Sequence, residues 1–183
     1  MDKVAVTVLG TDRPGIVYEV SSLLSSISCN IEDISQTVLE EEFAGIFLIS
    51  LPSDLTLESL NQTLKESLAP KDLYVFAKTI HLQKDIKKGD GQSFVVICIG
   101  PDKIGLVASF TKIMTDFYVN ITQLKFVHKS LTFPEQSVTI YEVEIPDSVS
   151  LSRFVEELKI EAKQHEVEVS VQHKKIFEDI CRI

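Results

Sequence analysis

The sequence GTDRPGIV at residues 10–17 recurs as GPDKIGLV at residues 100–107, a shift of 90 positions. The glycines and the aspartate keep their places, and the apolar positions that follow match in type as far as Asn-Ile at 30–31 and 120–121. Both apolar sets have the i, i+4, i+7, i+8 and i+11 spacing of one helical face. So many matches at one offset indicate an internal duplication.

Further along the chain the offset becomes 94, where Leu51-Pro52 corresponds to Ile145-Pro146. The second copy therefore has about four extra residues near 130–136, and Pro134 favours a loop there because proline interrupts a strand ladder. Each copy shows the order β-α-β-β-α-β of a ferredoxin-like domain. The sequence predicts an α+β protein of two tandem ferredoxin-like domains, each an antiparallel sheet with helices on one face.

The expected elements have the same order in both copies. We expect strands at 3–9, 30–40, 44–51, 73–82, 93–99, 120–130, 136–145 and 166–174, and helices at 14–27, 55–68, 104–117 and 150–164. Ser53 or Asp54, and Ser148 or Ser150, are candidate caps of the later helices. The near-continuous apolar first strands favour mid-sheet positions buried on much of both faces. The expected organisation is domain 1–82, a polar linker 83–92, domain 93–175 and a tail 176–183 whose Phe177, Ile180 and Ile183 could dock on the body or a neighbour.

The composition narrows the class of function. The net charge of -9 and the pI of about 4.9 disfavour direct nucleic-acid binding. The start resembles no secretory signal, no apolar run approaches the roughly 20 residues that span a bilayer, and three cysteines do not suggest a disulfide framework. We expect a cytoplasmic, reduced protein with no membrane contact. No metal-ligand spacing, cofactor fingerprint or catalytic motif is visible, so we expect no metal, no cofactor and no enzyme, with Cys98 an inert core thiol.

The turn that follows the first strand is the candidate binding feature of each copy. A helix N-terminus exposes backbone N–H groups with a partial positive charge, and glycines let a ligand approach the backbone. Pro14 could pre-set the first helical turn, and Asp12 with Asn30 could accept from an ammonium group. Two plainer interpretations stand beside this one. In the first, the aspartates only cap the helices; in the second, Asn30 and Asn120 are αL turn residues.

The run 10–17, followed by Cys29-Asn30-Ile31-Glu32-Asp33, resembles the signature of ACT domains. Two such domains without a catalytic or DNA-binding domain are similar to the glycine cleavage system transcriptional repressor family, and the resemblance covers about 3–82 and 93–174. It implies binding of an amino-acid effector, often at an interface between two domains, by the following residues. They are Gly10, Thr11, Asp12, Pro14, Gly15, Ile16, Asn30 and Ile31, and in the second copy Gly100, Asp102, Gly105, Leu106, Asn120 and Ile121.

The resemblance also implies regulation through a protein partner, an activator of transcription, without contact to DNA. The second copy departs from the signature at Pro101 and at Lys103-Ile104, so its site is expected to bind weakly, to bind another ligand or to be structural. Because the free face of each sheet needs cover, we expect the domains to pack together or the chain to form a homo-oligomer. Two alternatives remain open: a free-standing ACT regulatory subunit of a metabolic enzyme, and a ferredoxin-like interaction module without a ligand.

Overall fold

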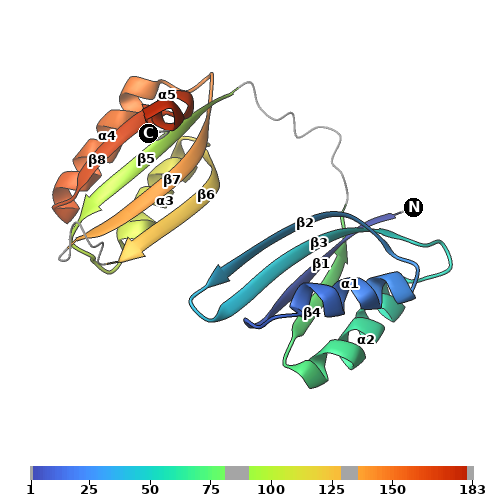
Figure 1. Ribbon diagram of the computed structural model, residues 1–183. Helices are drawn as coiled ribbons and strands as arrows, with labels where there is room; N and C mark the ends of the chain where they lie inside the picture. Colours follow the sequence, from blue (N-terminus) through green and yellow to red (C-terminus); the bar gives the residue numbers. More distant parts are fainter. Residues whose placement is uncertain (1, 81–90, 129–135, 181–183) are drawn as a thin grey trace. The chain divides into compact units, whose positions relative to one another are not determined.

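The computed structural model describes residues 2–80, 91–128 and 136–180. The chain divides into two compact units, Met1–Gln83 and Lys84–Ile183 (Figure 1). Residues 81–90 and 129–135 lie outside the described residues. They include most of the expected linker, most of the expected loop and the ends of the strands expected at 73–82 and 120–130. Residues 91 and 92 belong to a strand rather than to the linker, because β5 begins at Gly91.

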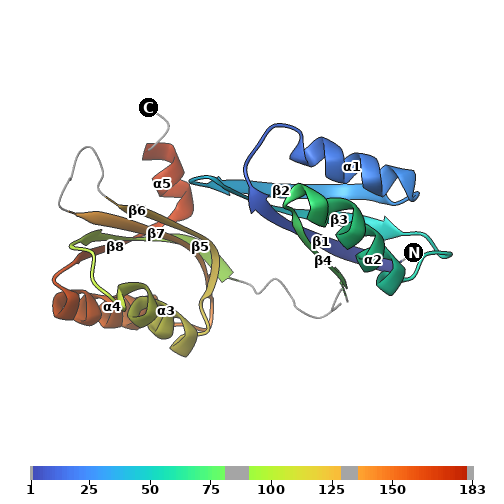
Figure 2. The same ribbon diagram turned by 90° about the horizontal axis from the view of Figure 1, so that it is seen from below.

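The first unit contains one four-stranded antiparallel sheet and two α-helices. The elements are β1 (Asp2–Thr11), α1 (Ile16–Ser26), β2 (Asn30–Leu39), β3 (Glu42–Leu51), α2 (Leu57–Leu68), a 3-10 turn η1 (Ala69–Lys71) and β4 (Tyr74–Thr79). The strand order is β2-β3-β1-β4, with antiparallel pairing throughout. Both helices lie on one face of the sheet (Figure 2).

The second unit repeats this arrangement and adds a final helix. Its elements are β5 (Gly91–Gly100), α3 (Leu106–Asp116), β6 (Asn120–His128), β7 (Ser137–Pro146), α4 (Leu151–His165), β8 (Glu168–His173) and α5 (Lys174–Ile180). The strand order β6-β7-β5-β8 corresponds strand by strand to that of the first unit. The predicted fold of two tandem ferredoxin-like domains is therefore confirmed.

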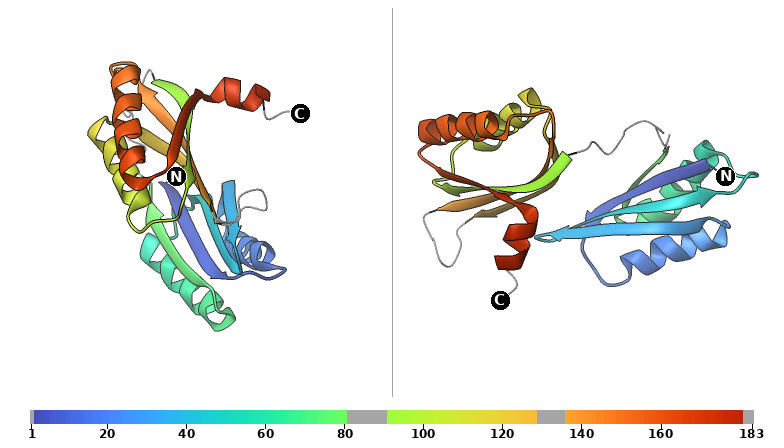
Figure 3. Two further views of the ribbon diagram at one scale, coloured as in Figure 1. Left: turned by 90° about the vertical axis from the view of Figure 1, so that its left-hand side faces the viewer. Right: turned by 90° about the horizontal axis from the view of Figure 1, so that it is seen from above.

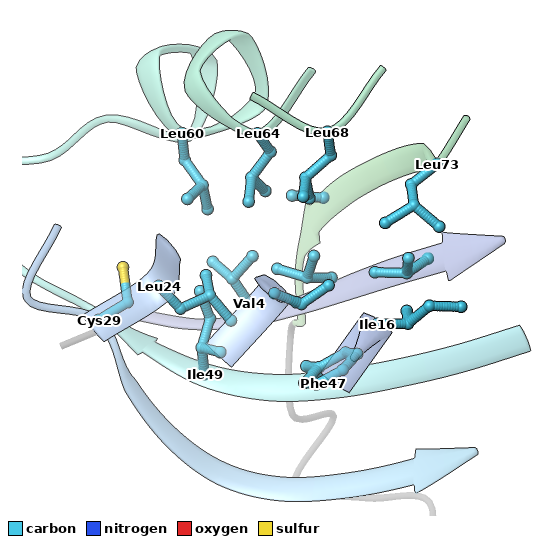
Figure 4. Close-up of a cluster of buried hydrophobic side chains, with 14 of the residues drawn as sticks. Val4, Ile16, Leu24, Cys29, Phe47, Ile49, Leu60, Leu64, Leu68 and Leu73 are labelled. Atoms are coloured by element: carbon cyan, nitrogen blue, oxygen red, sulfur yellow. The ribbon is translucent and has the colours of Figure 1, made fainter. Parts of the chain in front are cut away.

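The core of the first unit lies between its sheet and its helices (Figure 4). Ile16, Val20 and Leu24 of α1 are buried at i, i+4 and i+8, as the repeated apolar pattern predicts. Leu60, Leu64 and Leu68 give α2 the same kind of buried stripe. Each such side chain contributes about 1.5–3 kcal/mol on burial. This packing fixes where α1 begins relative to β1, and so it positions the turn between them.

The opposite faces of the two sheets differ. In the first unit this face exposes Leu9, Ile46 and Phe76 by 47%, 51% and 62%, so the expectation that β1 is buried on much of both faces is only half right. In the second unit α5 lies on this face, opposite to α3 and α4 (Figure 3), and contacts β5. Lys174 anchors α5 through a 2.7 Å ion pair with Glu142 of β7. No helix was predicted in this tail, although docking of Phe177, which is half-buried, was expected.

The helix ends correct two sequence interpretations. The N-cap of α2 is Thr56, whose hydroxyl accepts from the backbone N–H of Ser59 at 3.1 Å, so neither Ser53 nor Asp54 caps this helix. Ser150 is the N-cap of α4, but its side chain makes no capping hydrogen bond. α1 and α3 end in Schellman motifs with Ser28 and Tyr118 at positive φ.

Asn30 and Asn120 are therefore not the αL residues of these turns. Each asparagine comes two positions after the αL residue and is the first residue of a strand, β2 or β6. The backbone of both turns is accounted for without them. This geometry removes the plainer explanation for the repeated asparagines.

Candidate functional site

The turn between β1 and α1 depends on two glycines that do different work. A Cβ on Gly10 would lie 2.6 Å from the carbonyl oxygen of Asp72 and 2.8 Å from a methyl carbon of Leu73, so glycine allows the chain to pass close to the start of β4. Gly15 is the N-cap of α1 and has a φ of 98°, which L side chains rarely adopt. Glycine is thus required at both positions for different physical reasons.

No side chain caps α1, so the interpretation of Asp12 as a helix cap is wrong. Asp12 is exposed, and its backbone N–H donates to the carbonyl oxygen of Glu41 at 2.7 Å. Pro14 precedes the N-cap and lies outside the helix, so it does not set the first helical turn as expected. The uncapped helix start leaves backbone N–H donors with a partial positive charge available to an acceptor.

A groove of about 280 Å³ runs along this helix start. Its lining includes the expected residues Asp12, Gly15 and Ile16 and two residues that sequence reasoning missed, Gln36 of β2 and Phe43 of β3. Gln36 pairs with Gly45 in the sheet, and therefore its side chain is on the helix-covered face. The sequence alone does not show this placement, because it depends on the register of β2 against β3.

Ion pairs around Glu19 connect the turn to α1 and to η1. The Arg13 guanidinium donates to the two carboxylate oxygens of Glu19 at 2.8 and 3.0 Å, and Lys71 of η1 lies 3.4 Å from the same carboxylate. Hydrogen bonds from Arg13, aided by Lys71, lower the pKa of Glu19 from its ordinary 4.5 to about 2. Arg13 and Lys71 also line a second hollow of about 440 Å³ on the other side of the turn, together with Thr11 and Asp12. The sequence pattern alone predicts no role for Arg13, Glu19 and Lys71.

Asn30 and Ile31 lie far from the turn within the same unit. Asn30 pairs with Ser50, which pairs with Lys3 of β1, whereas Gly10 pairs with Phe43 at the other end of the sheet. Seven residues of strand separate Lys3 from Gly10, which corresponds to about 23 Å. Ile31 is half-buried against the core and precedes a β-bulge in which Glu32 is bonded to Lys3 and Ser50. One unit alone does not bring the two expected halves of the site together.

The second unit keeps the backbone of the turn but changes its surroundings. A Cβ on Gly100 would lie 2.7 Å from a side-chain carbon of Val167, and Gly105 is the N-cap of α3 with a φ of 90°. The partners of the groove differ: Phe126 and Ser137 correspond to Gln36 and Phe43 of the first unit. Asn120 pairs with Glu144, while Gly100 pairs with Ser137, so here too they lie at opposite ends of the sheet.

The remaining expected contact residues of the second unit occupy the same positions as those of the first. Asp102 lies in the turn, and Leu106, 3% exposed, opens α3. Ile121 packs against the core next to a bulge, as Ile31 does. In place of the Arg13 clip, Lys103 pairs with Glu166 at the end of α4. The two turns are alike in backbone and unlike in chemistry.

One cluster of the second unit has the residue types of a nucleophilic triad but not its geometry. Ser109 Oγ and Glu161 Oε1 both lie 3.1 Å from Nε2 of His165. In a working triad the acid holds one ring nitrogen while the other takes the proton of the nucleophile. Because both partners here share a single nitrogen, the cluster cannot relay a proton in that way.

Cys98 is 2% exposed, as predicted for a core thiol, and burial raises its pKa to about 12. Cys29 is also buried, and its pKa is raised for the same reason, while Cys181 lies outside the described residues. Within ranges 2–80, 91–128 and 136–180, no three His, Cys, Asp or Glu residues gather closely enough to hold a metal ion. None of the helices described is both long and apolar enough to cross a membrane.

The class of protein follows from the fold and the turn: two ferredoxin-like domains in tandem, each with a glycine-bearing strand-to-helix turn. The sequence profile of the ACT domain matches residues 3–78. A UPF0237 protein of Methanopyrus kandleri is 46% identical over 68 residues, which are 37% of this chain and 76% of the relative. The chain therefore belongs to the ACT-domain family, with two copies of the fold in tandem.

Two further comparisons connect the chain with one kind of regulator. The glycine cleavage system transcriptional repressor of Escherichia coli is 51% identical over 45 residues, 25% of this chain and 24% of the repressor. A crystal structure provisionally named as such a repressor superposes with a TM-score of 0.68 and 23% identity, and covers 93% of this chain and 96% of its own. The chain is similar in sequence to the former over a short stretch, and in fold to the latter over both units.

Proposed function

We propose that this protein is an amino-acid-responsive regulator without catalytic activity, whose effector binds at the β1–α1 turn of the first unit. The observation that carries the proposal is the groove along the uncapped start of α1. The free helix N–H groups suit the carboxylate of an amino acid, and the exposed Asp12 suits its ammonium group. Gln36 adds an amide that can bond a polar side chain of the effector.

Asn30 enters this site from a second domain. It lies at the opposite end of the sheet in its own unit, and the αL geometry of Ser28 frees it from any role in the turn. In this proposal the asparagine that completes the groove comes from another copy of the chain in a homo-oligomer. The exposed apolar side chains Leu9, Ile46 and Phe76 give the first unit a surface on which such an assembly can form.

We further propose that the regulator acts through a protein partner in the control of glycine cleavage or related amino-acid metabolism. The net charge of -9 opposes binding to a phosphate backbone and leaves a protein as the suitable partner. The similarity to the E. coli repressor favours a partner in transcription over a metabolic enzyme. Capture of the partner by the tagged full chain, with and without the effector, separates these two candidates.

A thermal-shift screen of the full chain against the common amino acids, glycine and serine included, tests the binding step. A ligand at 100 times its dissociation constant adds about 2.7 kcal/mol to the free energy of unfolding. We expect a specific shift that Asp12→Ala and Asn30→Ala both abolish. Asp54→Ala is a matched control, because Asp54 is exposed and caps nothing. If no amino acid shifts the transition at millimolar concentration, the ligand-free interaction module becomes the better account.

A further inference from the structure

A second groove, larger than the one at the β1–α1 turn, lies in the second unit where α3 ends and α4 begins. Its volume is about 620 Å³, and its lining includes Ile113, Phe117 and Tyr118 from the α3 side and Arg153 and Glu157 from α4. It is at the other end of α3 from the Gly100–Gly105 turn. It therefore belongs to neither copy of the β1–α1 site.

Three charged residues line the groove, and one of them, Asp116, is paired with Lys112 at 2.7 Å, which leaves the charges of Arg153 and Glu157. Arg153 lies over the ring of Phe117, with its guanidinium carbon 5.8 Å from the ring centroid. Glu157 follows one helical turn later, yet neither residue forms an ion pair with any residue that the structure describes. The stacking on Phe117 thus holds the guanidinium in place without using its hydrogen-bond donors.

The wall between these charges is apolar. Ile113 and Phe117 are half-buried, and each leaves part of its side chain facing the groove. Tyr118 is 86% exposed and occupies the αL position of its turn, with a φ of 56°. An aromatic residue is an unfavourable choice at such a position, because glycine or asparagine fits it at less cost.

The first unit builds the same backbone without any of this chemistry. Ile27 and Ser28 stand where the second unit has Phe117 and Tyr118, and Ser59 and Thr63 stand where it has Arg153 and Glu157. That unit also folds its two helices onto a buried core. Phe117 also packs on Phe154 of the core, with ring centroids 5.5 Å apart, so it serves the fold as well. Arg153, Glu157 and the exposed ring of Tyr118 have no such counterpart in the first unit, and a separate role accounts for them.

We propose that this groove binds a zwitterionic amino acid with an apolar side chain. Its carboxylate bonds the Arg153 guanidinium, its ammonium group bonds the Glu157 carboxylate, and its side chain packs on Ile113, Phe117 and Tyr118. Residues four apart on a helix have Cβ atoms about 6 Å apart, which suits the two charged ends of one α-amino acid. The protein then carries two chemically different ligand sites, one in each unit.

Calorimetric titration of the full chain with L-leucine, L-methionine and L-phenylalanine tests this assignment. At least one of the three is expected to bind in a 1:1 ratio with the chain. Its N-acetyl and amide forms, which lack one charge each, should bind about tenfold or more weakly, because a hydrogen bond to a charged group is lost. No binding of any of the three at millimolar concentration overturns the proposal.

Three variants locate the site. Arg153→Met and Glu157→Gln are each expected to weaken binding by about tenfold or more. Lys159→Met is the matched control on the exposed side of α4, and it should bind like the wild type. Arg153 and Lys159 are exposed and Glu157 is half-buried, and the unfolding transition of each variant checks that it folds.

Asp12→Ala separates this site from the groove of the first unit, and should leave the titration unchanged. If Asp12→Ala abolishes binding while Arg153→Met does not, the ligand occupies the first unit and the present assignment is wrong. Conversely, loss of binding in Arg153→Met alone supports the second groove even where the effector site of the first unit fails its own test.

Discussion

Gly10 shows at the scale of one residue how closely the turn is packed. Its missing Cβ would meet the backbone oxygen of Asp72 at 2.6 Å, and backbone cannot move aside as a flexible side chain can. We expect Gly10→Ala to lower the free energy of unfolding of the first unit by about 1–3 kcal/mol through overpacking. Denaturant unfolding of Gly10→Ala measures this loss of stability. Gly105→Ala is the comparison, because no atom lies within 4 Å of its new Cβ. Gly105→Ala also loses stability, but through its φ of 90° alone, while Gly10 has no positive φ and only crowding opposes its new Cβ. Unchanged stability of Gly10→Ala would contradict the crowding.

Glu19 makes stability depend on pH. Its pKa is lowered from 4.5 to about 2 in the folded protein by the hydrogen bonds from Arg13. Because the pKa of Glu19 is lower in the folded than in the unfolded protein, the ionised carboxylate stabilises the fold above about pH 4.5. This contribution is lost as the pH falls from about 4.5 towards 2. We expect Glu19→Gln to melt at a lower temperature than the wild type at pH 7, with the difference closing below pH 4. A difference that stays constant between pH 7 and pH 3 would contradict this role for the carboxylate.

At the scale of single residues, the sequence indicated those with special backbone requirements. It did not indicate residues whose role depends on tertiary contacts. Gly10 and Gly15 are visible because a repeated glycine beside an aspartate and a helix pattern has few explanations. Gln36 and Arg13 are not visible, because their place in the groove depends on strand register and on a side chain reaching Glu19. Asp12 was found, but the capping role considered for it is wrong because the helix begins three residues later than that role requires.

Helix ends offer a stability test at the scale of the element. Ser28 holds a φ of 60° at the end of α1, a conformation that costs an L-residue about 1–2 kcal/mol. Glycine avoids this cost but loses more entropy on folding, so we expect Ser28→Gly to raise the free energy of unfolding by about 0.5–1 kcal/mol. Ser25→Gly, inside the last turn of the helix, is the control and should lower it by about 1 kcal/mol. Thermal unfolding of the two variants decides the sign.

The core-facing side of β7 carries buried hydroxyl groups, whereas that of its counterpart β3 does not. Thr139 and Tyr141 are 0% exposed, and their hydroxyl oxygens have no hydrogen-bond partner among the described residues. Gly45 and Phe47 occupy the same places in the first unit. Thr139→Val keeps the shape and removes a buried hydroxyl, so we expect it to raise the free energy of unfolding by about 1 kcal/mol. Chemical denaturation measures this change, and a loss of stability instead would show that the hydroxyl has a bound partner such as water.

The order of the elements could be predicted because apolar periodicity repeats in both copies, and the structure confirms it. The exact ends of the helices were harder to predict from the sequence. Thr56 caps α2 because its hydroxyl reaches the N–H of Ser59, and nothing in the sequence distinguishes it from Ser53 or Asp54. α5 was missed because Lys174–Ile180 is short, and its packing on β5 and its ion pair with Glu142 are tertiary contacts.

At the scale of the whole chain, the two units share a fold and differ in their grooves. The two units share strand order, glycine turns and Schellman motifs, while their grooves differ in charge, ring content and position. The expectation that the second β1–α1 site binds differently from the first stays a prediction. The sequence could not predict that Asn30 lies some 23 Å along the sheet from its supposed partners, because that follows only from the pairing register.

The central claim is that the bare start of α1 receives the carboxylate of an amino-acid effector. Amide chemical shifts of the ¹⁵N-labelled full chain, followed during titration with glycine or serine, report on those N–H groups directly. We predict saturable shifts concentrated in residues 12–18 and at Gln36 and Asn30, with the corresponding residues 102–108 of the second unit much less affected. Saturable shifts that bypass residues 12–18, or unchanged spectra at millimolar ligand, would contradict the account.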